Sequence, residues 1–355
     1  YDLSPPVASG SFRCARMFSP LPSDPLVSIV MPAYNYARFL PDAIDSILSQ
    51  DYPRIELIVI DDGSTDDTPD VLASYGSRLW WVRQPNAGQT VALNRGWRQA
   101  TGDVIGYLNA DDVLVPGAIA AAVDALRMRP DAVMSYGDFT VIDADSRETA
   151  RCVLPADMDL AAILRVGYSP FGPGSLVRRV PALPAWDETL SRVLDFDYAL
   201  RLACLGPFVH VPRVVASFRV HERSISFAKP PDRVTDEPIR VVRQLYADAP
   251  LPPRIVAMKG RAFAMARMSA AQGHLRARRW HRAAWCMARA LRWCPRMLDD
   301  AHVYRLVVSG VAGQFLHRRR SRQLARRAAD TVTADSPGAV GADFVSSQHS
   351  SSAGD

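Results

Sequence analysis

Short apolar runs alternate with helix-like segments through the first 140 residues or so of the chain. The strand-like runs span residues 26–32, 55–60, 79–82, 103–109 and 132–138. The segments between them, with apolar residues at helical spacing, span residues 37–50, 66–75, 88–100 and 116–129. Parallel strands need helical crossovers, so this alternation predicts an α/β fold with a mostly parallel sheet flanked by helices.

Polar clusters directly follow three of these runs. They are PAYN at 32–35, DDGS at 61–64 and NADD at 109–112. Ligands of such sheets bind beyond the carboxyl ends of the strands, so we expect the three clusters to meet in one crevice. Adjacent carboxylates need solvent, a cation or hydrogen-bond donors to coexist, and NADD ends in two. A cation site and an ordinary solvated turn are both consistent with this pattern.

The composition limits the class of protein. The chain has 355 residues, of which 48% are hydrophobic, so it can bury a core and exceeds a typical single domain. Its five cysteines show no CxxC pair or metal-ligand spacing, which favours buried thiols in a reducing compartment. We see no apolar run of membrane-spanning length and no signal peptide, and therefore expect a cytoplasmic protein. The first residue is Tyr, so the natural N-terminus may lie upstream.

Charge is distributed unevenly along the chain. Residues 255–330 contain 17 Arg and Lys but only 3 Asp and Glu, a net +14 within a total of +5. This charge suggests peripheral contact with an anionic membrane, at the inner face of the cytoplasmic membrane. The alternative, which we slightly favour, is a helical cap that packs on the α/β domain. We find no nucleic-acid-binding module and expect no nucleic-acid partner.

Periodicity and composition also suggest domain boundaries. We expect a loose arm at 1–25, an α/β domain at 26–228, an arginine-rich helical extension at 237–330 and a disordered tail at 331–355. Within the extension, residues 264–295 resemble one tetratricopeptide-like helical hairpin, and no second copy follows.

Four stretches carry a family resemblance. They are VSIVMPAYNYARFLPDAIDSILSQDYPRIELIVIDDGSTDDT (27–68), PNAGQTVALNRGWRQATGDVIGYLNADD (85–112), DFDYALRLACLG (195–206) and FRVHERSIS (218–226). Their order and spacing resemble the bacterial family-2 glycosyltransferases, which have the GT-A fold. The resemblance implies inverting transfer of a sugar from a nucleotide-diphosphate sugar to a hydroxyl of a glycan, lipid-linked or other acceptor. It also implies a divalent cation, Mn²⁺ or Mg²⁺, and a role in cell-surface polysaccharide synthesis.

The resemblance assigns several residues to the nucleotide. Positions matching Pro32, Ala33 and Tyr34 line the base in the family, and the acid matching Asp62 hydrogen-bonds it. The alternative for the DDGS segment is a strand-to-helix turn with a capping acid. The family often has Arg before the matching Asn, whereas this chain has Leu before it and Arg after it. We expect that pair, Asn94 and Arg95, to lie near the nucleotide.

The NADD segment matches the D-x-D motif of the family. Asn109 replaces the first Asp and keeps an oxygen for a ribose hydroxyl. The metal is then assigned to Asp111, with Asp112 as its partner or as support behind it. The general base of the family corresponds to Asp195, where Leu194 replaces the usual Glu. At a helix N-terminus this carboxylate could otherwise be a simple helix-end charge.

Further positions follow from the same resemblance. His221 matches a histidine that approaches the diphosphate or the metal, although a lone His after a strand is often structural. We also expect Asp138, Gly174 and Ser175 on the donor-sugar or acceptor side, and an i,i+4 pair between Asp197 and Arg201.

Two other classes of function remain as alternatives. A nucleotidyltransferase or dehydrogenase on a related sheet is disfavoured because the chain has neither a GxGxxG fingerprint nor a P-loop. A catalytically weakened scaffold would have lost its base or its metal site. Asn109 and Leu194 point slightly that way, whereas Asp111, Asp112 and Asp195 all remain.

Overall fold

The computed structural model describes residues 18–156, 158–221, 224, 229–300 and 303–311. All of them belong to one compact unit that ends at Val311. The predicted arm is therefore described only from residue 18, and the predicted tail at 331–355 lies outside the described residues. No helix in the described part is both long and apolar enough to cross a membrane.

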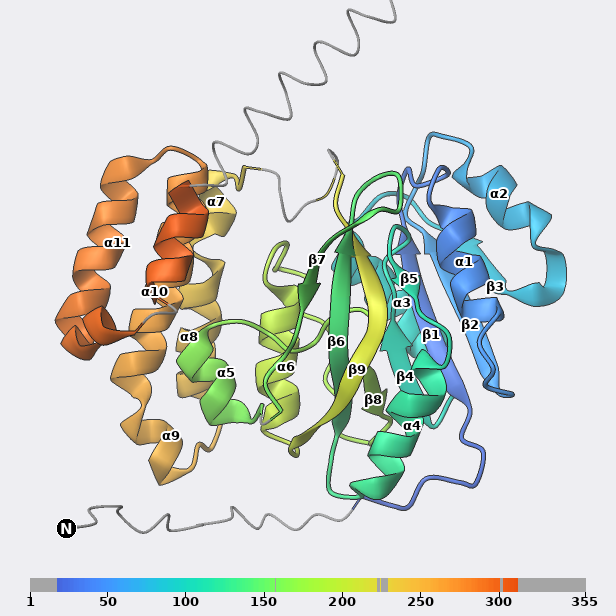
Figure 1. The fold of residues 1–355 in the computed structure, drawn as a ribbon, viewed down its shortest axis with the longest axis horizontal. Coiled ribbons are helices and arrows are strands. Elements are labelled where there is room, and N and C mark those ends of the chain that lie inside the picture. Colours follow the sequence, from blue (N-terminus) through green and yellow to red (C-terminus); the bar gives the residue numbers. More distant parts are fainter. Residues whose placement is uncertain (1–17, 157, 222–223, 225–228, 301–302, 312–355) are drawn as a thin grey trace, which may run out of the picture. The chain divides into compact units, whose positions relative to one another are not determined.

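A nine-stranded sheet forms the centre of the unit (Figure 1). The strands are β1 Val27–Ala33, β2 Ile55–Asp61, β3 Trp80–Arg83, β4 Val104–Tyr107, β5 Val113–Leu114, β6 Met134–Ile142, β7 Glu148–Cys152, β8 Leu176–Arg178 and β9 Phe208–Arg219. Their order is β3-β2-β1-β4-β8-β6-β9-β5, and β7 pairs with β6.

Helices cover the sheet and continue beyond it. They are α1 Leu40–Leu48, α2 Thr68–Ser74, α3 Gln89–Gln99, α4 Ala118–Met128, α5 Leu160–Val166, α6 Leu194–Ala203, α7 Asp232–Thr235, α8 Glu237–Asp248, α9 Pro253–Ala257, α10 Lys259–Arg276 and α11 Trp280–Trp293, with short 3₁₀ turns η1 Gly76–Arg78 and η2 Pro295–Asp299. The predicted α/β fold is confirmed. The strands and helices expected up to residue 138 lie within a few residues of their predicted bounds.

Strand direction explains where the polar clusters lie. β1 runs parallel to both β2 and β4, and its neighbours pair Ala33 with Asp61 and Val30 with Tyr107. The carboxyl ends of these three strands therefore meet at one edge. β5, β7 and β8 pair antiparallel with their neighbours, so the sheet is mixed on its far side. These short strands were not predicted as antiparallel elements.

Alternate residues of β1 face two different cores. Ile29 and Met31 pack in a cluster with α1 and α4, whereas Val30 packs in a cluster with α3 and α6. All seven residues of β1 are buried, as expected for a central strand covered on both faces. The continuous apolar run that predicts this strand therefore serves two helical layers.

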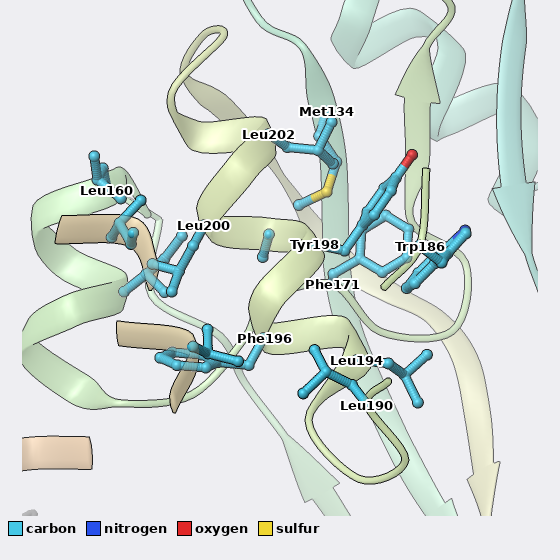
Figure 2. Packing of buried hydrophobic residues seen from close by; sticks show 14 of the residues in the cluster. Met134, Leu160, Phe171, Trp186, Leu190, Leu194, Phe196, Tyr198, Leu200 and Leu202 are labelled. Atoms are coloured by element: carbon cyan, nitrogen blue, oxygen red, sulfur yellow. The ribbon is translucent and has the colours of Figure 1, made fainter. Parts of the chain in front are cut away.

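The core that contains Val30 extends into the C-terminal helices. It includes Val241 of α8 and Ala262 of α10 together with residues of α5 and α6. Figure 2 shows Phe196 and Leu200 of α6 pointing toward the helix that carries Leu160, while Tyr198 points the other way, toward Trp186. The helical extension thus packs on the α/β part as a cap.

The predicted helical hairpin corresponds to α10 and α11, which pack against each other. The turn between them lies at residues 277–279, where Arg278 adopts a positive φ of 61°. Gly273 lies inside α10 and not at the turn. A Cβ there would come within 2.9 Å of the Thr235 side chain, so the glycine permits close packing on α7.

The last residues of the predicted arm are anchored to the unit. Arg178 donates to the Ser19 carbonyl through Nη1 (3.3 Å), and the Tyr52 hydroxyl donates to the Pro25 carbonyl (2.6 Å). Residues 18–25 therefore differ from the expected loose arm. The cause is long-range bonding from residues that the local sequence does not reveal.

Gly106 offers a test of the central strand pairing. It lies on β4 opposite Leu176, and a Cβ there would come 2.7 Å from the Ser175 carbonyl oxygen. We expect Gly106→Ala to lower the free energy of unfolding by about 1–3 kcal/mol because the backbone must shift. Gly260→Ala is the control, because the nearest atom at that position of α10 is 3.5 Å away. It should be neutral or stabilising by up to about 1 kcal/mol in denaturant titrations. Equal effects would contradict the pairing.

Candidate active site

One buried arginine lies beneath the acid pair at the end of β4. Arg219, the last residue of β9, is only 1% exposed. Its backbone N–H donates to Asp112 Oδ1 at 2.9 Å, and its Nε donates to the Asp111 carbonyl at 2.8 Å. These hydrogen bonds join the end of β9 to the segment that follows β4, about a hundred residues earlier in the sequence.

The remaining guanidinium nitrogens reach two further segments. Nη1 donates to the Asp143 carbonyl and to Ser146 Oγ, in the turn after β6. Nη2 lies 3.1 Å from Asp42 Oδ2 of α1, and the guanidinium carbon lies 5.0 Å from the Phe39 ring centroid. A buried charge is costly unless it is paired and its donors are satisfied, and these contacts supply both conditions.

Asp112 is fully enclosed. Its Oδ2 accepts a hydrogen bond from Asn109 Nδ2 (3.0 Å), and Asn109 Oδ1 in turn accepts from Gln89 Nε2 (2.8 Å). Burial and the neighbouring charge of Asp111 raise the pKa of the Asp112 carboxyl. Of the two roles expected for Asp112, this geometry favours support behind the site. The oxygen of Asn109 expected to bind ribose accepts a hydrogen bond from Gln89 here, and its predicted contact with a ribose hydroxyl stays a prediction.

Asp111 and His221 come together at the edge of the sheet. His221 Nε2 lies 2.9 Å from Asp111 Oδ2, and both residues are less than 10% exposed. The His221 ring is held between Phe39 (4.8 Å between centroids) and Tyr36 (5.8 Å). One carboxylate and one imidazole form a donor set that Mn²⁺ accepts readily, whereas Mg²⁺ prefers oxygen. The residues present therefore fit a divalent cation, with Asp111 and His221 as its holders.

Asp62 fixes the loop that leads into α3. Its Oδ1 accepts from Gln84 Nε2 and from the backbone N–H of Ala87, and its Oδ2 accepts from the N–H of Gly88. It is 4% exposed. Arg95 Nη1 lies 3.2 Å from Gln84 Oε1, so Arg95 is linked to Asp62 through that glutamine. The observed contacts of Asp62 are with the protein, and its predicted contact with a base stays a prediction.

Asn94 is engaged elsewhere. Its Nδ2 donates to the Trp186 carbonyl and to Glu188 Oε1, and its Oδ1 accepts from the Trp186 N–H. The side chain is 5% exposed and has its hydrogen-bonding groups satisfied. Asn94 thus anchors the loop at 186–188, and the expectation that it lies near the nucleotide stays a prediction.

The PAYN cluster exposes one side chain of the predicted nucleotide set. Pro32 and Ala33 lie inside β1 and are buried, whereas Tyr34 is 44% exposed. Only Tyr34 among these three presents a side-chain surface on which a base ring can pack. Pro32 and Ala33 set the end of the strand.

Asp195 lies in the first turn of α6. Burial raises the pKa of its carboxyl to about 6, although backbone N–H groups at the helix start oppose the shift. No side chain in the described part of the chain donates to this carboxylate, while its carbonyl accepts from Ser169 Oγ. Asp197 is different: its carboxylate accepts from Arg201 Nε at 2.9 Å, the pair expected from the sequence.

Tyr107 connects the two acidic regions. Burial raises the pKa of its phenol, and the negative charges of Asp195 and Asp112 add to the shift. Its ring stacks on Phe171 at 5.3 Å and meets Trp186 edge to face at 5.5 Å. The loop that Asn94 anchors therefore belongs to an aromatic layer that also includes Tyr107.

Three further expectations meet a different geometry. Asp138 Oδ1 accepts from the Leu154 N–H and lies 3.0 Å from His210 Nε2, so it joins β6 to neighbouring segments. Ser175 is 2% exposed and its Oγ accepts from the N–H of Gly172. Gly174 has φ +80° and lies where a Cβ would meet Val215 at 2.9 Å. The observed contacts of these three residues are within the protein, and their expected place on the donor-sugar or acceptor side stays a prediction.

Sequence reasoning missed Arg219, Gln89 and Tyr107. A signal existed for Arg219, because it precedes His221 by two residues in an extended segment. Side chains two apart on a strand share one face, so Arg219 and His221 should approach the same cluster. Gln89 and Tyr107 have no comparable local signal.

The role of Arg219 can be tested with a conservative replacement. Arg219→Lys keeps the charge but loses the fork that bridges Asp111, the turn after β6 and α1. We expect affinity for Mn²⁺, measured by calorimetric titration, to fall by about 10–100-fold, the usual effect of losing a residue that orients a metal ligand. Arg213→Lys, on the same strand but exposed, is the matched control. An unchanged affinity in Arg219→Lys would remove this role.

Comparison with known proteins finds a family similarity over part of the chain and a shared fold. Residues 28–174 match the family model described as glycosyl transferase family 2. An uncharacterized glycosyltransferase of Rickettsia prowazekii (strain Madrid E), RP339, is 31% identical over 209 residues, covering 56% of this chain and 64% of the relative. Chondroitin synthase of Escherichia coli is 28% identical over 212 residues, covering 58% and 30%. The match thus spans less than two thirds of either relative.

Two solved structures share the fold. Staphylococcus aureus TarS 1–349 in complex with UDP-GlcNAc superposes with a TM-score of 0.60 and 16% identity, covering 84% of this chain and 92% of that one. The mannosyltransferase PcManGT from Pyrobaculum calidifontis, with GDP-Man and Mn²⁺, gives 0.55 and 21%, covering 83% and 82%. Residues 28–174 are thus similar to glycosyl transferase family 2, and the two solved structures show that the described unit has their fold.

Proposed function

We propose that the chain moves a sugar from a nucleotide-diphosphate sugar to an acceptor hydroxyl, with inversion at the anomeric carbon. Asp195 is the general base in this proposal. The observation that carries it is the state of Asp195: a partly buried carboxylate with a pKa of about 6 and no side-chain donor in the described residues. A base is most effective when its pKa lies near the working pH and its oxygens are free to accept a proton.

The position of Asp195 suits a single displacement. It lies in the first turn of α6, where the backbone N–H groups at the start of a helix favour the charged form after the acceptor arrives. The charges of Asp195 and Asp112 both raise the pKa of the Tyr107 phenol, so the proposed base and the acid pair lie near the same side chain. Inverting transfer needs one base on the side of the acceptor, and Asp195 meets that need.

The donor side of the proposal rests on the edge formed by β1, β2 and β4. Tyr34 offers a ring surface for the base, and Asp62 holds the loop before α3 through three hydrogen bonds. Asp111 and His221 would hold the divalent cation, and Asp112 with Asn109 and Arg219 would keep Asp111 in place. The cation supplies positive charge that neutralises the diphosphate leaving group.

The acceptor is proposed to be a glycan or a lipid-linked hydroxyl in cell-surface polysaccharide synthesis. Relatives named chondroitin synthase, from Escherichia coli, and hyaluronan synthase, from Pasteurella multocida, support a polysaccharide product. Peripheral contact with the inner face of the cytoplasmic membrane, through the basic extension, belongs to the same proposal.

A donor screen tests the activity. Purified protein with Mn²⁺ should release nucleoside diphosphate from at least one member of a panel containing UDP-GlcNAc, UDP-glucose, UDP-glucuronate and GDP-mannose, with more release when short glycans are added. The release should disappear with chelator and return with Mn²⁺. No release with any donor, in protein that keeps its native melting transition, would support the scaffold alternative.

Replacing the base gives a sharper prediction. Asp195→Asn should lower transfer to acceptor by about 10²–10⁴-fold, because the variant cannot take the hydroxyl proton. Affinity for the donor nucleotide should stay close to that of the original protein. Asp197→Asn is the matched control on the same helix, and it should keep most of the transfer rate. Equal rates for Asp195→Asn and the original protein would remove Asp195 from the mechanism.

The raised pKa of Asp195 also predicts pH dependence. The base must be ionised, so kcat/KM should fall about tenfold per pH unit below an apparent pKa of about 6. Folding raises this pKa above 3.8, so ionisation of Asp195 costs stability above pH 6 and costs none below 3.8. Asp195→Asn should therefore melt about 1–3 °C higher than the original protein at neutral pH. The gain should vanish at acidic pH, and a constant gain would contradict the assignment.

A further inference from the structure

The C-terminal helices contain a long stretch without acidic residues. Residues 249–298 include 11 Arg and Lys and no Asp or Glu. The stretch covers α9, α10, α11 and most of η2. A charge distribution of this kind produces a positive surface wherever the basic side chains are exposed on one face.

On α11 the exposed basic residues share one face. Four residues follow one another at spacings of three and four and are all exposed: Arg282, Trp285, Arg289 and Arg292, here called the α11 stripe. Arg296 continues the spacing just beyond the helix. The neighbouring face of α11, about 100° around the helix, buries Ala283, Cys286 and Ala290.

Packing directs the stripe outward. α11 packs on α10 and η2, and Figure 1 shows it on the side of α10 that is turned away from the sheet. Helix α11 therefore acts as part of the cap on its inner face and presents the stripe on its outer face. The cap and the membrane contact, set out as alternatives from the sequence, occupy different faces of one helix.

Acidic groups near the stripe leave most of its charge unbalanced. Asp232 of α7 pairs with Arg282 and lies 3.5 Å from Arg279. Asp300 pairs with Arg261 of α10 (2.6 Å). Within the described residues, Arg289, Arg292 and Arg296 have no acidic partner. These three arginines are the main unpaired positive charges of the stripe and its continuation.

Tryptophan accompanies the charge. Trp285, in the middle of the stripe, is 54% exposed, and the Arg289 guanidinium lies 4.9 Å from its ring centroid. Trp280 at the start of α11 is 50% exposed, and Leu298 of η2 is 55% exposed. Tryptophan beside arginine is typical of surfaces that lie at the interface between water and lipid headgroups.

Two other partners fit these features less well. A second copy of the chain meeting the stripe face to face would set arginines against arginines. A nucleic acid would stack its bases on open rings, and the Arg289 guanidinium lies over Trp285, the ring in the middle of the stripe. This leaves Trp280, at the start of α11, as the ring on which a base could stack.

We propose that the α11 stripe docks this protein on the surface of an anionic phospholipid membrane. The arginines meet the lipid phosphates, and Trp285 enters the headgroup layer. The docking rests on the membrane contact in the proposed function and names the surface that makes it, and it does not require turnover. Its failure in a binding experiment would therefore leave the proposed transferase activity untouched.

Vesicle sedimentation with the full chain tests the proposal. The protein should bind vesicles of phosphatidylcholine with a third phosphatidylglycerol at low salt, and should bind pure phosphatidylcholine at least about tenfold more weakly. Raising the salt to several hundred millimolar should weaken the binding markedly, because charges at a surface are screened. Equal binding to both kinds of vesicle, or no binding to either, would overturn the proposal.

Variants locate the surface. Arg289→Glu, Arg292→Glu and Arg296→Glu together should weaken binding to anionic vesicles by about tenfold or more. The matched control reverses three exposed arginines elsewhere, Arg98, Arg129 and Arg151, and should change binding less than about twofold if the stripe is the contact. Trp285→Ala should weaken the part of the vesicle binding that persists at high salt. Melting curves show that each variant is folded.

The outcomes separate membrane from other polyanions. Single-stranded RNA, added as a competitor, should displace the protein from vesicles only at concentrations at which it acts as a general polyanion. The Trp285→Ala variant should bind RNA as the original protein does. Equal loss of binding in the control triple would show a diffuse charge effect and overturn the stripe. Tighter binding to RNA than to anionic vesicles would overturn the membrane as the partner.

Discussion

The site depends on the burial of one guanidinium group. Arg219 is 1% exposed, and its nitrogens contact the acid pair, the turn after β6 and α1. Removing a charge from water costs several kcal/mol, and only a full set of partners offsets that cost. The segments that supply these partners are therefore held in one arrangement. This arrangement orients the Asp111 carboxylate toward His221.

A second set of contacts positions the proposed base. Asn94 holds the Trp186 loop, Trp186 stacks on Tyr198 of α6 at 4.0 Å, and Tyr107 meets the same aromatic layer. Packing against this aromatic layer fixes the position of α6, and therefore of Asp195 in its first turn. Burial near this layer raises the pKa of Asp195, so the packing that orients the acid also tunes it. Burial of the ionised Asp195 carboxylate lowers the stability of the protein, and the same burial gives the proposed base its raised pKa.

Much of the fold and part of the site could be predicted because the signals are local. The apolar run of β1 and the acids that follow β4 lie in short, continuous stretches, and the parallel register brings their ends together. A family resemblance predicted that His221 approaches the diphosphate or the metal, and the structure places His221 2.9 Å from Asp111, the predicted metal ligand. The contacts that Asn94 and Asp138 make within the protein could not be predicted, because their partners Trp186 and His210 lie 92 and 72 residues away. The burial of Arg219, which decides its role, also depends on segments far away in the sequence, such as those that carry Asp42, Asp112 and Ser146.

The central claim is that one acid, Asp195, takes the acceptor proton in a single displacement on this site. The anomeric configuration of the product, determined by NMR with the donor that the protein turns over, tests this claim most directly. A donor with an α-linked nucleotide should give a β-linked product. An α-linked product from that donor would contradict the single displacement and the role of Asp195 as its only base.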